Sequence, residues 1–201
     1  DPAFQRFLTE LHGRRLKVVD GRAFTVHAGH RPGSGDLRAG LIASPTMEVL
    51  LLLGGNMGDV RVTLDQAEAR ITERVGAVRA RSREHWTAPW GFRDHRLFLN
   101  RALLVDTHLA PEELLQRTLA IERELGRVRE TGVGYAARPI DIDLLLWGQQ
   151  VISLQDLHVP HPRMHERSFA LAPAADVAPD WSHPLLHRTV LNLLNDVLRS
   201  A

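Results

Sequence analysis

Two aspartates separated by a single residue are the strongest sign of chemistry in this sequence. Asp141 and Asp143 lie in an apolar, partly β-branched run. Pro139 and Gly148 bound this run, which predicts a strand over residues 140–146. Because side chains alternate along a strand, both carboxylates point the same way, roughly 6–7 Å apart. A hard cation such as Mg²⁺ binds one or two carboxylates together with phosphate oxygens, and would relieve their repulsion.

Arginines surround the loop that leads into this strand. Arg127 and Arg129 precede the loop glycines Gly132 and Gly134, and Arg138 comes just before the strand. A planar guanidinium binds phosphate through two hydrogen bonds, and the glycines could act as hinges if the loop closes over a polyphosphate. Taken alone, the aspartates could equally mark a solvated edge strand that resists association. The arginines favour a metal and phosphate site.

A second cluster of polar residues follows further along the chain. His161 is flanked by Pro160 and Pro162, which restrict the backbone, and Arg163 and Arg167 come soon after. An isolated histidine is usually structural, but here two arginines accompany it. This group could therefore also bind an anion.

Aromatic and amide side chains offer a site for a flat ligand. The loop over residues 87–94 carries Trp90 and Phe92, which could stack on a ligand or cap the core. Asn100 lies among apolar residues of a predicted strand. If buried, its amide needs partners, and these could be the edge of a heterocycle or the protein backbone.

The elements that must position these residues follow from apolar periodicity. Strands are expected over residues 48–53, 77–86, 98–105 and 140–146. Helices are expected from Asp59 to just before Gly76 and over residues 111–125. This βαββαβ order predicts an α+β fold, a ferredoxin-like sandwich. An extra C-terminal hairpin, with Gly148-Gln149-Gln150 turning into Val151-Ile152, and helices complete the prediction.

Composition limits the possible classes of protein. The chain has 201 residues, of which 44% are hydrophobic and 24% charged, so it can bury an ordinary core. The net charge of +1 gives no overall attraction to nucleic acid or membrane, and the absence of cysteine excludes disulfides and thiolate sites. We expect a soluble, cytoplasmic monomer with no nucleic-acid or membrane partner.

The first 46 residues differ from the rest. Turn-forming residues dominate positions 29–36, and residues 1–46 contain no motif that can be assigned. We therefore predict an N-terminal extension of unknown role over residues 1–46 and a catalytic domain over residues 47–201.

Four motifs in order carry a resemblance to a known family. They are Gly54-Gly55-Asn56-Met57-Gly58-Asp59, Gly126-Arg127-Val128-Arg129, Arg138-Pro139-Ile140-Asp141-Ile142-Asp143 and Val159-Pro160-His161-Pro162-Arg163-Met164 with Arg167 and Phe169. Together they make residues 47–201 resemble 6-hydroxymethyl-7,8-dihydropterin pyrophosphokinases. The resemblance implies transfer of the pyrophosphoryl group of ATP to the pterin hydroxymethyl group in folate biosynthesis, with release of AMP.

The resemblance also implies roles for individual residues. Asp141 and Asp143 would hold two Mg²⁺ ions, while Arg127 and Arg138 would stabilise the transferring group. Pterin contacts are implied for Thr87, Ala88, Phe98, Asn100 and Phe169, with the two phenylalanines sandwiching the ring. ATP contacts are implied for Glu122, Arg129, His161 and Arg167.

Some positions depart from the family pattern. Glu130 replaces a lysine that contacts phosphate, and Asp156 stands where some members have a nucleotide-site arginine. Pro139 replaces a common threonine, and Tyr135-Ala136-Ala137 replaces an aromatic-Gly-Pro segment. These changes concern loop closure and ATP affinity rather than the reaction.

Two other interpretations of the chain are open. Ferredoxin-like sheets often bind RNA, but this requires strand aromatics and a basic face, whereas only 5% of residues are aromatic. The two aspartates in a strand and the net charge near zero also argue against RNA binding. Alternatively, residues 1–46 could be the tail of a fused folate enzyme, although 46 residues are too few for a catalytic domain. They could also be a docking arm or an artefact of where the start was placed.

Overall fold

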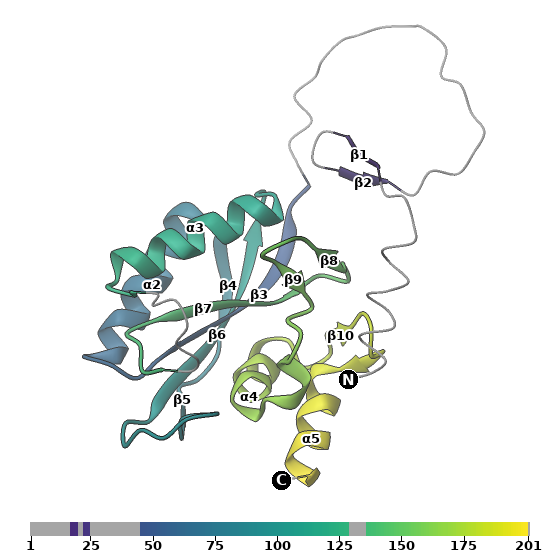
Figure 1. Ribbon diagram of the computed structural model, residues 1–201. Coiled ribbons are helices and arrows are strands. Elements are labelled where there is room, and N and C mark those ends of the chain that lie inside the picture. Colours follow the sequence, from purple (N-terminus) through teal and green to yellow (C-terminus); the bar gives the residue numbers. More distant parts are fainter. Residues whose placement is uncertain (1–16, 20–21, 25–44, 129–135, 201) are drawn as a thin grey trace, which may run out of the picture. The chain divides into compact units, whose positions relative to one another are not determined.

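The computed structural model describes residues 17–19, 22–24, 45–128 and 136–200 (Figure 1). The chain divides into two compact units, Asp1–Ile42 and Ala43–Ala201. In the first unit, strands β1 (Lys17–Val19) and β2 (Arg22–Phe24) pair antiparallel. The second unit contains all the elements discussed below.

One antiparallel sheet forms the centre of the second unit. Its strands are β3 (Met47–Gly55), β4 (Ala77–Arg81), β5 (His85–Thr87), β6 (Phe98–Thr107) and β7 (Asp141–Trp147). The order across the sheet is β4-β6-β3-β7, and β5 also pairs with β6. The first and third strands of the βαββαβ order therefore lie side by side in the middle, as the ferredoxin-like prediction requires.

Alternation along the central strand divides the core into two parts. Val49, Leu51 and Leu53 belong to one apolar cluster, whereas Leu50 and Leu52 belong to the other. Side chains of a strand alternate between faces, so β3 packs against elements on both sides. This explains why residues 49–53 are apolar at every position rather than at every second one.

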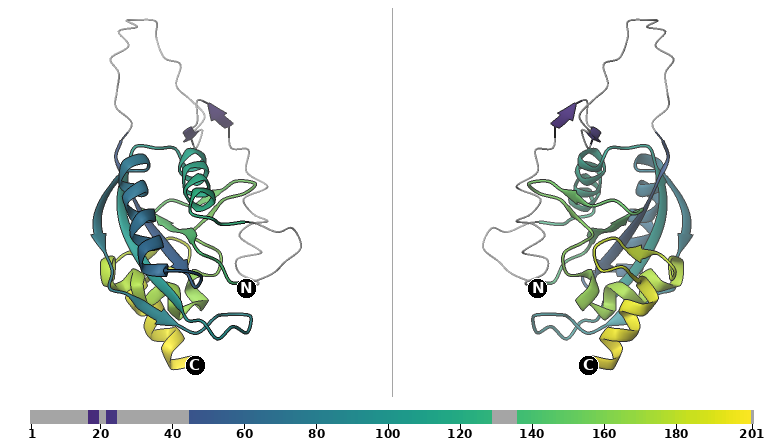
Figure 2. Two further views of the ribbon diagram at one scale, coloured as in Figure 1. Left: turned by 90° about the vertical axis from the view of Figure 1, so that its left-hand side faces the viewer. Right: turned by 90° about the vertical axis from the view of Figure 1, so that its right-hand side faces the viewer.

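Two helices cover one face of the sheet. α2 (Val60–Arg74) and α3 (Pro111–Glu124) lie on the same side of the sheet (Figure 2). They supply Leu64, Ile71 and Ile121 to the cluster around Leu51. The side chain of Asp59 caps α2 by accepting a hydrogen bond from the amide of Val62. The buried residues of α2 are Val60, Leu64, Ala67 and Ile71, the stripe that its periodicity predicts.

The other face is covered by α4 (Ser168–Val177) and α5 (Val190–Ser200). Leu171 of α4 and Leu193 of α5 are buried in the cluster around Leu50. β8 (Ile152–Ser153), β9 (His158–Val159) and a 3₁₀ turn over Met164–Glu166 join the sheet to α4. β10 (Ser182–His183) and β11 (Arg188–Thr189) lie between α4 and α5.

Two details of the prediction were wrong. The single strand expected over residues 77–86 is interrupted, because the hydroxyl of Ser82 donates to the carbonyl of Arg83 and accepts from the amide of Ala102. A C-terminal hairpin forms as predicted, but not through the turn at Gly148, because β8 pairs with β9 and not with β7. Local turn signals do not identify which strand is the partner.

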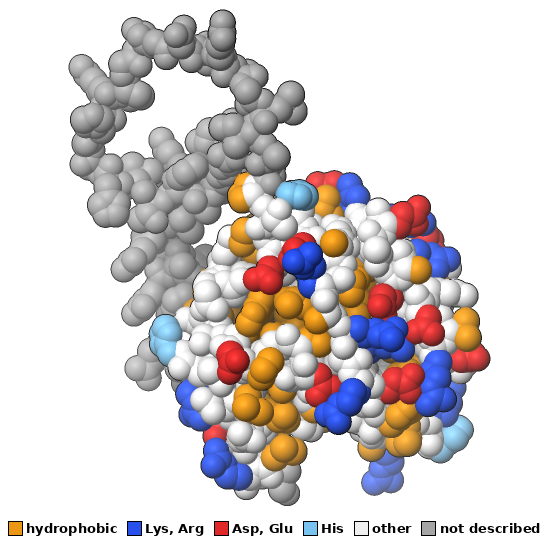
Figure 3. Space-filling view, turned by 180° about the vertical axis from the view of Figure 1, so that it is seen from behind, with side chains coloured by type: hydrophobic (Ala, Val, Ile, Leu, Met, Phe, Trp, Pro, Cys, Tyr) orange, Lys and Arg blue, Asp and Glu red, His pale blue; other side chains and the backbone are white. Residues whose placement is uncertain are grey.

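The surface carries charges of both signs. Figure 3 shows acidic and basic side chains interspersed on the face opposite that of Figure 1, with apolar groups between them. Within the described ranges, no helix combines the length and the apolar character that crossing a membrane requires.

Candidate active site

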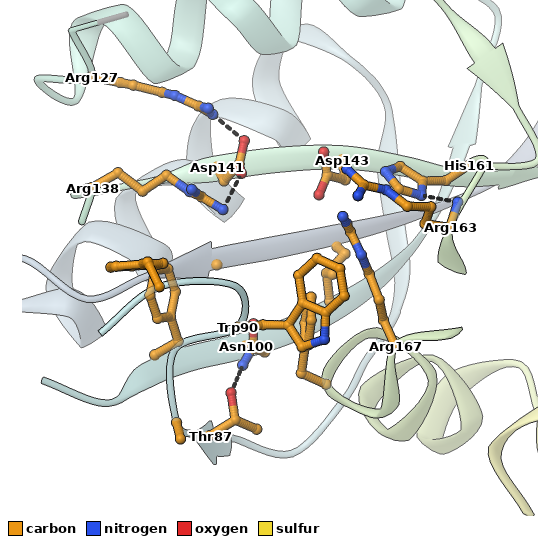
Figure 4. A pocket seen from close by; sticks show the side chains of 16 residues that line it. Thr87, Trp90, Asn100, Arg127, Arg138, Asp141, Asp143, His161, Arg163 and Arg167 are labelled. Carbon is orange, nitrogen blue, oxygen red and sulfur yellow. Dashed lines mark hydrogen bonds and ion pairs between the residues drawn. The ribbon is translucent and has the colours of Figure 1, made fainter. Parts of the chain in front are cut away.

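A cavity of about 530 Å³ opens where β3, β6 and β7 meet the loop after β5 and the start of α4 (Figure 4). This volume lies within the usual range for small-molecule sites, roughly 300–1,000 Å³. The cavity is lined by Leu52, Gly54, Thr87, Ala88, Trp90, Phe92, Phe98, Asn100, Arg127, Arg138, Asp141, Asp143, His161, Arg163, Arg167 and Phe169.

The register of the sheet places an amide and a carboxylate side chain on either side of the same glycine. Gly54 of β3 pairs with Asn100 on one side and with Asp141 on the other. A Cβ atom at position 54 would lie 3.2 Å from Oδ1 of Asn100, so a side chain here would crowd the cavity. Glycine at position 54 therefore leaves space between Asn100 and Asp141.

Asp141 is held by arginines on both sides. Nη2 of Arg138 lies 2.8 Å from Oδ2 of Asp141, and Arg127 pairs with Oδ1. Arg127 also donates to Oε1 of Glu122 at 2.8 Å, and the same oxygen accepts from the amide of Ile142. Glu122 is buried, so it acts as a brace between α3, Arg127 and β7.

Asp143 lies in a different electrostatic environment. Burial, followed by the charge of Asp141, raises the pKa of this carboxyl group, while Arg167 and Arg138 oppose the shift. A bound cation would favour its ionised form. Among the described residues no cluster of three or more acidic, histidine or cysteine ligands occurs. Two carboxylates facing a cavity suit Mg²⁺, which completes its shell with phosphate oxygens and water.

The segment that carries His161 and Arg163 provides hydrogen-bond donors for an anion. The amide of Arg163 donates to Nδ1 of His161 at 3.2 Å, which leaves the Nε2 position of a neutral ring to carry the proton. Burial, followed by the charges of Arg167 and Arg163, lowers the pKa of His161 to about 4. Near neutral pH this ring is therefore an uncharged donor.

Arg138 is fixed through its backbone. The backbone amide of Arg138 donates to the side-chain Oδ1 of Asn56 at 2.9 Å. The backbone amide of Asn56 donates to the carbonyl oxygen of Arg138, also at 2.9 Å. A Cβ atom on Gly55 would lie 2.3 Å from the carbonyl oxygen of Pro139, so only glycine permits this close approach. Nε of Arg138 is buried without a partner among the described residues, a position that an anionic ligand could satisfy.

Aromatic rings line the side of the cavity away from the carboxylates. The ring of Trp90 lies 6.2 Å from that of Phe169, and Phe92 meets Phe98 edge-on at 6.1 Å. The guanidinium of Arg167 lies 4.8 Å from the Trp90 ring. Phe98 and Phe169 thus each have an aromatic neighbour from the loop after β5.

The amide of Asn100 is buried at the cavity. Asn100 is 3% exposed, and its Nδ2 donates to Oγ1 of Thr87 at 2.9 Å and to the carbonyl of His85 at 3.3 Å. Both alternatives for this amide remain relevant, since it bonds within the protein and also lines the cavity. Its contacts fix the position of Thr87.

Most of the residues singled out from sequence surround this cavity. They are Thr87, Ala88, Phe98, Asn100, Arg127, Arg138, Asp141, Asp143, His161, Arg167 and Phe169. Glu122 lies behind Arg127 rather than in the lining. Arg129, the departure at Glu130 and the hinge glycines Gly132 and Gly134 lie outside the described residues.

Some lining residues were not assigned to the site from sequence. Leu52 and Gly54 line it because the central strand passes beneath. Arg163, Trp90 and Phe92 also line it; the sequence suggested anion binding for the first, and either ligand stacking or capping of the core for the other two. Asn56 stood within a glycine-rich motif, but its bond to Arg138 is a contact between residues 82 positions apart, which no local pattern reveals.

Comparison with known proteins identifies relatives. Residues 50–179 match the family model described as 7,8-dihydro-6-hydroxymethylpterin-pyrophosphokinase. A 2-amino-4-hydroxy-6-hydroxymethyldihydropteridine pyrophosphokinase of Porphyromonas gingivalis is 43% identical over 138 residues, covering 68% of this chain and 93% of the relative. One of the same name from Bacillus subtilis is 42% identical over 128 residues, covering 63% and 75%.

Solved structures share the fold. A Plasmodium falciparum HPPK-DHPS triple mutant superposes with a TM-score of 0.65 at 16% identity, covering 79% of this chain. The match covers 46% of that longer protein, so this chain spans less than half of its length. The family match, together with the close relatives, confirms the resemblance found in the motifs. The chain belongs to the 7,8-dihydro-6-hydroxymethylpterin-pyrophosphokinase family, the enzymes that transfer a pyrophosphoryl group to a pterin in folate biosynthesis.

Proposed function

We propose that the described cavity binds 6-hydroxymethyl-7,8-dihydropterin and ATP together and transfers the pyrophosphoryl group between them. One observation carries the proposal: a single cavity is lined by two carboxylates, by aromatic and amide side chains, and by arginine and histidine side chains (Figure 4). The aromatic and amide side chains suit a flat heterocycle, and the arginine and histidine side chains suit phosphates. The carboxylates lie where the two substrates would meet.

On the pterin side, three kinds of contact fix the substrate. Phe98 and Phe169 would stack on the two faces of the ring, which is the geometry that aromatic pairs favour. Asn100 and Thr87, with the backbone near Ala88, would meet its polar edge. A ligand held this way presents its hydroxymethyl group toward the carboxylates.

On the nucleotide side, cationic and neutral donors would hold the phosphates. His161 and Arg167 line the cavity, and Arg129 would join them from the loop. Arg127 and Arg138 flank Asp141 and would stabilise the charge that develops on the transferring group. The single chain supplies all these groups, so a monomer suffices.

The proposed site also suits metal ions. Asp141 and Asp143 would hold two Mg²⁺ ions, which would neutralise charge on the phosphate oxygens when bound. In the reaction, the hydroxymethyl oxygen forms a bond to the β-phosphorus of ATP. The bond from that phosphorus to the oxygen bridging to the α-phosphate breaks, AMP leaves, and the hydroxyl proton is released.

An assay of AMP formation tests this proposal. AMP should form only when ATP, the pterin and Mg²⁺ are all present, and Asp141→Asn and Asp143→Asn should each lower kcat by at least ~100-fold. Asp196→Asn is the control, because this aspartate also pairs with arginines but lies on α5. Release of ADP instead of AMP would identify an ordinary kinase and contradict the proposal.

A further inference from the structure

One carboxylate outside the cavity connects two of the elements that line it, the helix α4 and the strand β5. Oδ1 of Asp176 on α4 accepts from Nη2 of Arg83 at 2.9 Å, and Oδ2 accepts from the amide and Nε of the same arginine. Oδ2 also lies 2.8 Å from Nε2 of His85, the first residue of β5. The Asp176 and His85 side chains are only 18% and 19% exposed. Helix and strand are thus connected by a largely buried polar contact.

The strand on one side of this contact carries the amide end of the pterin wall. The carbonyl of His85 accepts from Nδ2 of Asn100, and the same nitrogen donates to Thr87 two residues further along β5. Thr87 and Ala88 line the cavity. The position of His85 therefore affects three groups proposed to meet the pterin.

The helix on the other side carries the opposing ring. Phe169 precedes Asp176 by seven residues, which is about two helical turns, so both side chains project from neighbouring parts of the helix surface. Phe169 lines the cavity while Asp176 reaches β5. The distance between Phe169 and the residues of β5 therefore depends on α4 and on its contact with the strand.

β5 has few other constraints within the part of the chain that the structure describes. It has three residues, and it pairs with β6 alone, at the edge of the sheet. A second neighbouring strand that would fix the edge is absent from the described sheet. Side-chain contacts with α4, which packs against β5, must therefore supply part of its positioning.

We propose that Asp176 is a positioning residue that sets the width of the pterin site by fastening β5 to α4. This inference rests on the proposed function, since it takes Asn100 and Phe169 as the two sides of the pterin pocket. The residue acts through others and does not itself touch the substrate. Its loss should weaken pterin binding without changing the arginine and carboxylate groups that hold ATP.

The test measures pterin affinity by calorimetry in the presence of a saturating non-hydrolysable ATP analogue. Asp176→Asn should raise the Kd for 6-hydroxymethyl-7,8-dihydropterin about tenfold, because small displacements of positioning groups have effects of this order or larger. The Kd for the ATP analogue alone should change less than about twofold, within the error expected for an uninvolved site. Asp176→Glu, which retains the charge, should restore most of the pterin affinity.

His85→Leu provides a second and independent variant. It removes the more buried contact but leaves the Arg83–Asp176 ion pair intact. It should raise the Kd for pterin but not the Kd for the ATP analogue. The double variant His85→Leu/Asp176→Asn should bind pterin no more weakly than the weaker-binding of the two single variants. Additive losses would show that the residues act separately and would overturn the inference.

Asp196→Asn is the matched control for stability. Asp196 also pairs with two arginines, Arg188 at 2.8 Å and Arg199 at 2.7 Å, yet lies on α5. It should leave both affinities unchanged. If Asp176→Asn lowers pterin and ATP affinity equally, in step with a lower Tm, the role is purely structural and the inference fails.

Asn100→Ala separates failure of this inference from failure of the proposed function. If the wild-type protein binds pterin and Asn100→Ala loses that binding, the pterin site is established. An unchanged Asp176→Asn variant would then refute only the positioning role. If Asn100→Ala binds pterin normally, the location of the pterin site is wrong, and both proposals fall together.

Discussion

At the scale of single residues, buried charges are paired before any substrate is bound. Glu122 is 1% exposed, yet it accepts hydrogen bonds from Arg127 and from the amide of Ile142. Arg127 in turn contacts Asp141. A chain of this kind keeps the arginine extended toward the cavity, which would lower the cost of organising the site when phosphates bind.

Removal of this brace should affect stability strongly. Glu122→Ala removes the acceptor of a buried amide and one of the two carboxylates that pair with Arg127, and should cost about 3 kcal/mol of unfolding free energy. Urea denaturation measures this. Glu124→Ala on the same helix is the control, because its side chain is 42% exposed and an exposed ion pair contributes little to stability. Equal losses in the two variants would contradict the brace.

Trp90 is a second residue whose effect can be tested separately. Its ring lies beside Phe169 and beneath Arg167, so it should shield the stacked pterin from water. Trp90→Ala should raise the KM for pterin about tenfold, corresponding to the loss of roughly 1.4 kcal/mol of aromatic contact. Steady-state kinetics with varied pterin would reveal this change.

Trp86→Ala controls for the loss of a large ring near the site. Trp86 is 44% exposed, close to the 39% of Trp90, but it packs under Arg61 instead of lining the cavity. Its removal should leave the pterin KM unchanged. A similar rise in both variants would show that the loss of apolar bulk, and not contact with pterin, causes the effect.

The sequence was sufficient for residues whose chemistry is unusual for their location. Two aspartates in an apolar strand, and arginines beside them, are recognisable without a structure. Trp90 and Arg163 could be named only as candidates, because a loop tryptophan or a surface arginine is ordinary in any protein. Their participation depends on where α4 and the loop after β5 meet, which is a property of the fold.

At the scale of elements, close packing of the backbone determines which substitutions are tolerated. Gly55 and Gly76 both lie where a Cβ atom would strike a carbonyl oxygen, that of Pro139 at 2.3 Å and that of Asp106 at 1.9 Å. Gly55 is the last residue of β3, and Gly76 follows the end of α2. Only the first, however, lies against the segment that carries Arg138.

Alanine at these two positions should separate stability from activity. Gly55→Ala and Gly76→Ala should each lower the unfolding free energy by about 1–3 kcal/mol, because backbone must move to admit the methyl group. Only Gly55→Ala should also lower kcat, since it displaces Pro139 and the adjacent Arg138. Activity is measured per folded enzyme at a temperature well below both Tm values; a comparable kcat loss in Gly76→Ala would refute the distinction.

A histidine in the β10 segment should make stability depend on pH. Nδ1 of His183 accepts from the amides of Leu185 and Leu186, each at 3.3 Å, which requires an unprotonated nitrogen. Burial is the main cause that lowers the pKa of His183, to about 4, with the charge of His165 next. Between about pH 6.5 and 4 the unfolded chain therefore binds more protons, and stability falls as pH falls.

Replacement by asparagine should flatten this dependence. His183→Asn keeps an oxygen near the position of Nδ1 but cannot titrate, so the decline in unfolding free energy from pH 7 to 4 should shrink by about 2 kcal/mol. Urea denaturation across that pH range measures it. Part of the decline should persist, because the pKa of His161 is also lowered to about 4. His95→Asn, at a side chain 90% exposed, should leave the slope unchanged.

The elements themselves were predictable to different degrees. The stripe of Val60 and Leu64 on α2 follows directly from helical spacing, and continuous apolar runs indicated the central strands. The break at Ser82 was missed, because it depends on a hydrogen bond to Ala102 across the sheet. The pairing of β8 with β9 was missed for the same reason: it depends on a partner strand that no local signal specifies.

At the scale of the whole molecule, every described cavity residue comes from the second unit. The lining begins at Leu52 and ends at Phe169, within Ala43–Ala201. The apolar clusters that support the sheet also lie entirely within this unit. We therefore propose that it is the catalytic domain and that residues 1–42 are not required for its fold.

A truncated protein tests this division. Residues 43–201 alone should fold with one cooperative unfolding transition and retain kcat and both KM values within about twofold, since remote and independent sites contribute additively. Circular dichroism during heating and the AMP assay would measure these properties. The Asp141→Asn substitution in the truncated chain should abolish activity as it does in the full chain. A truncated protein that folds but has a raised KM for ATP would assign residues 1–42 a part in nucleotide binding, whereas one that fails to fold would show that the two units are interdependent.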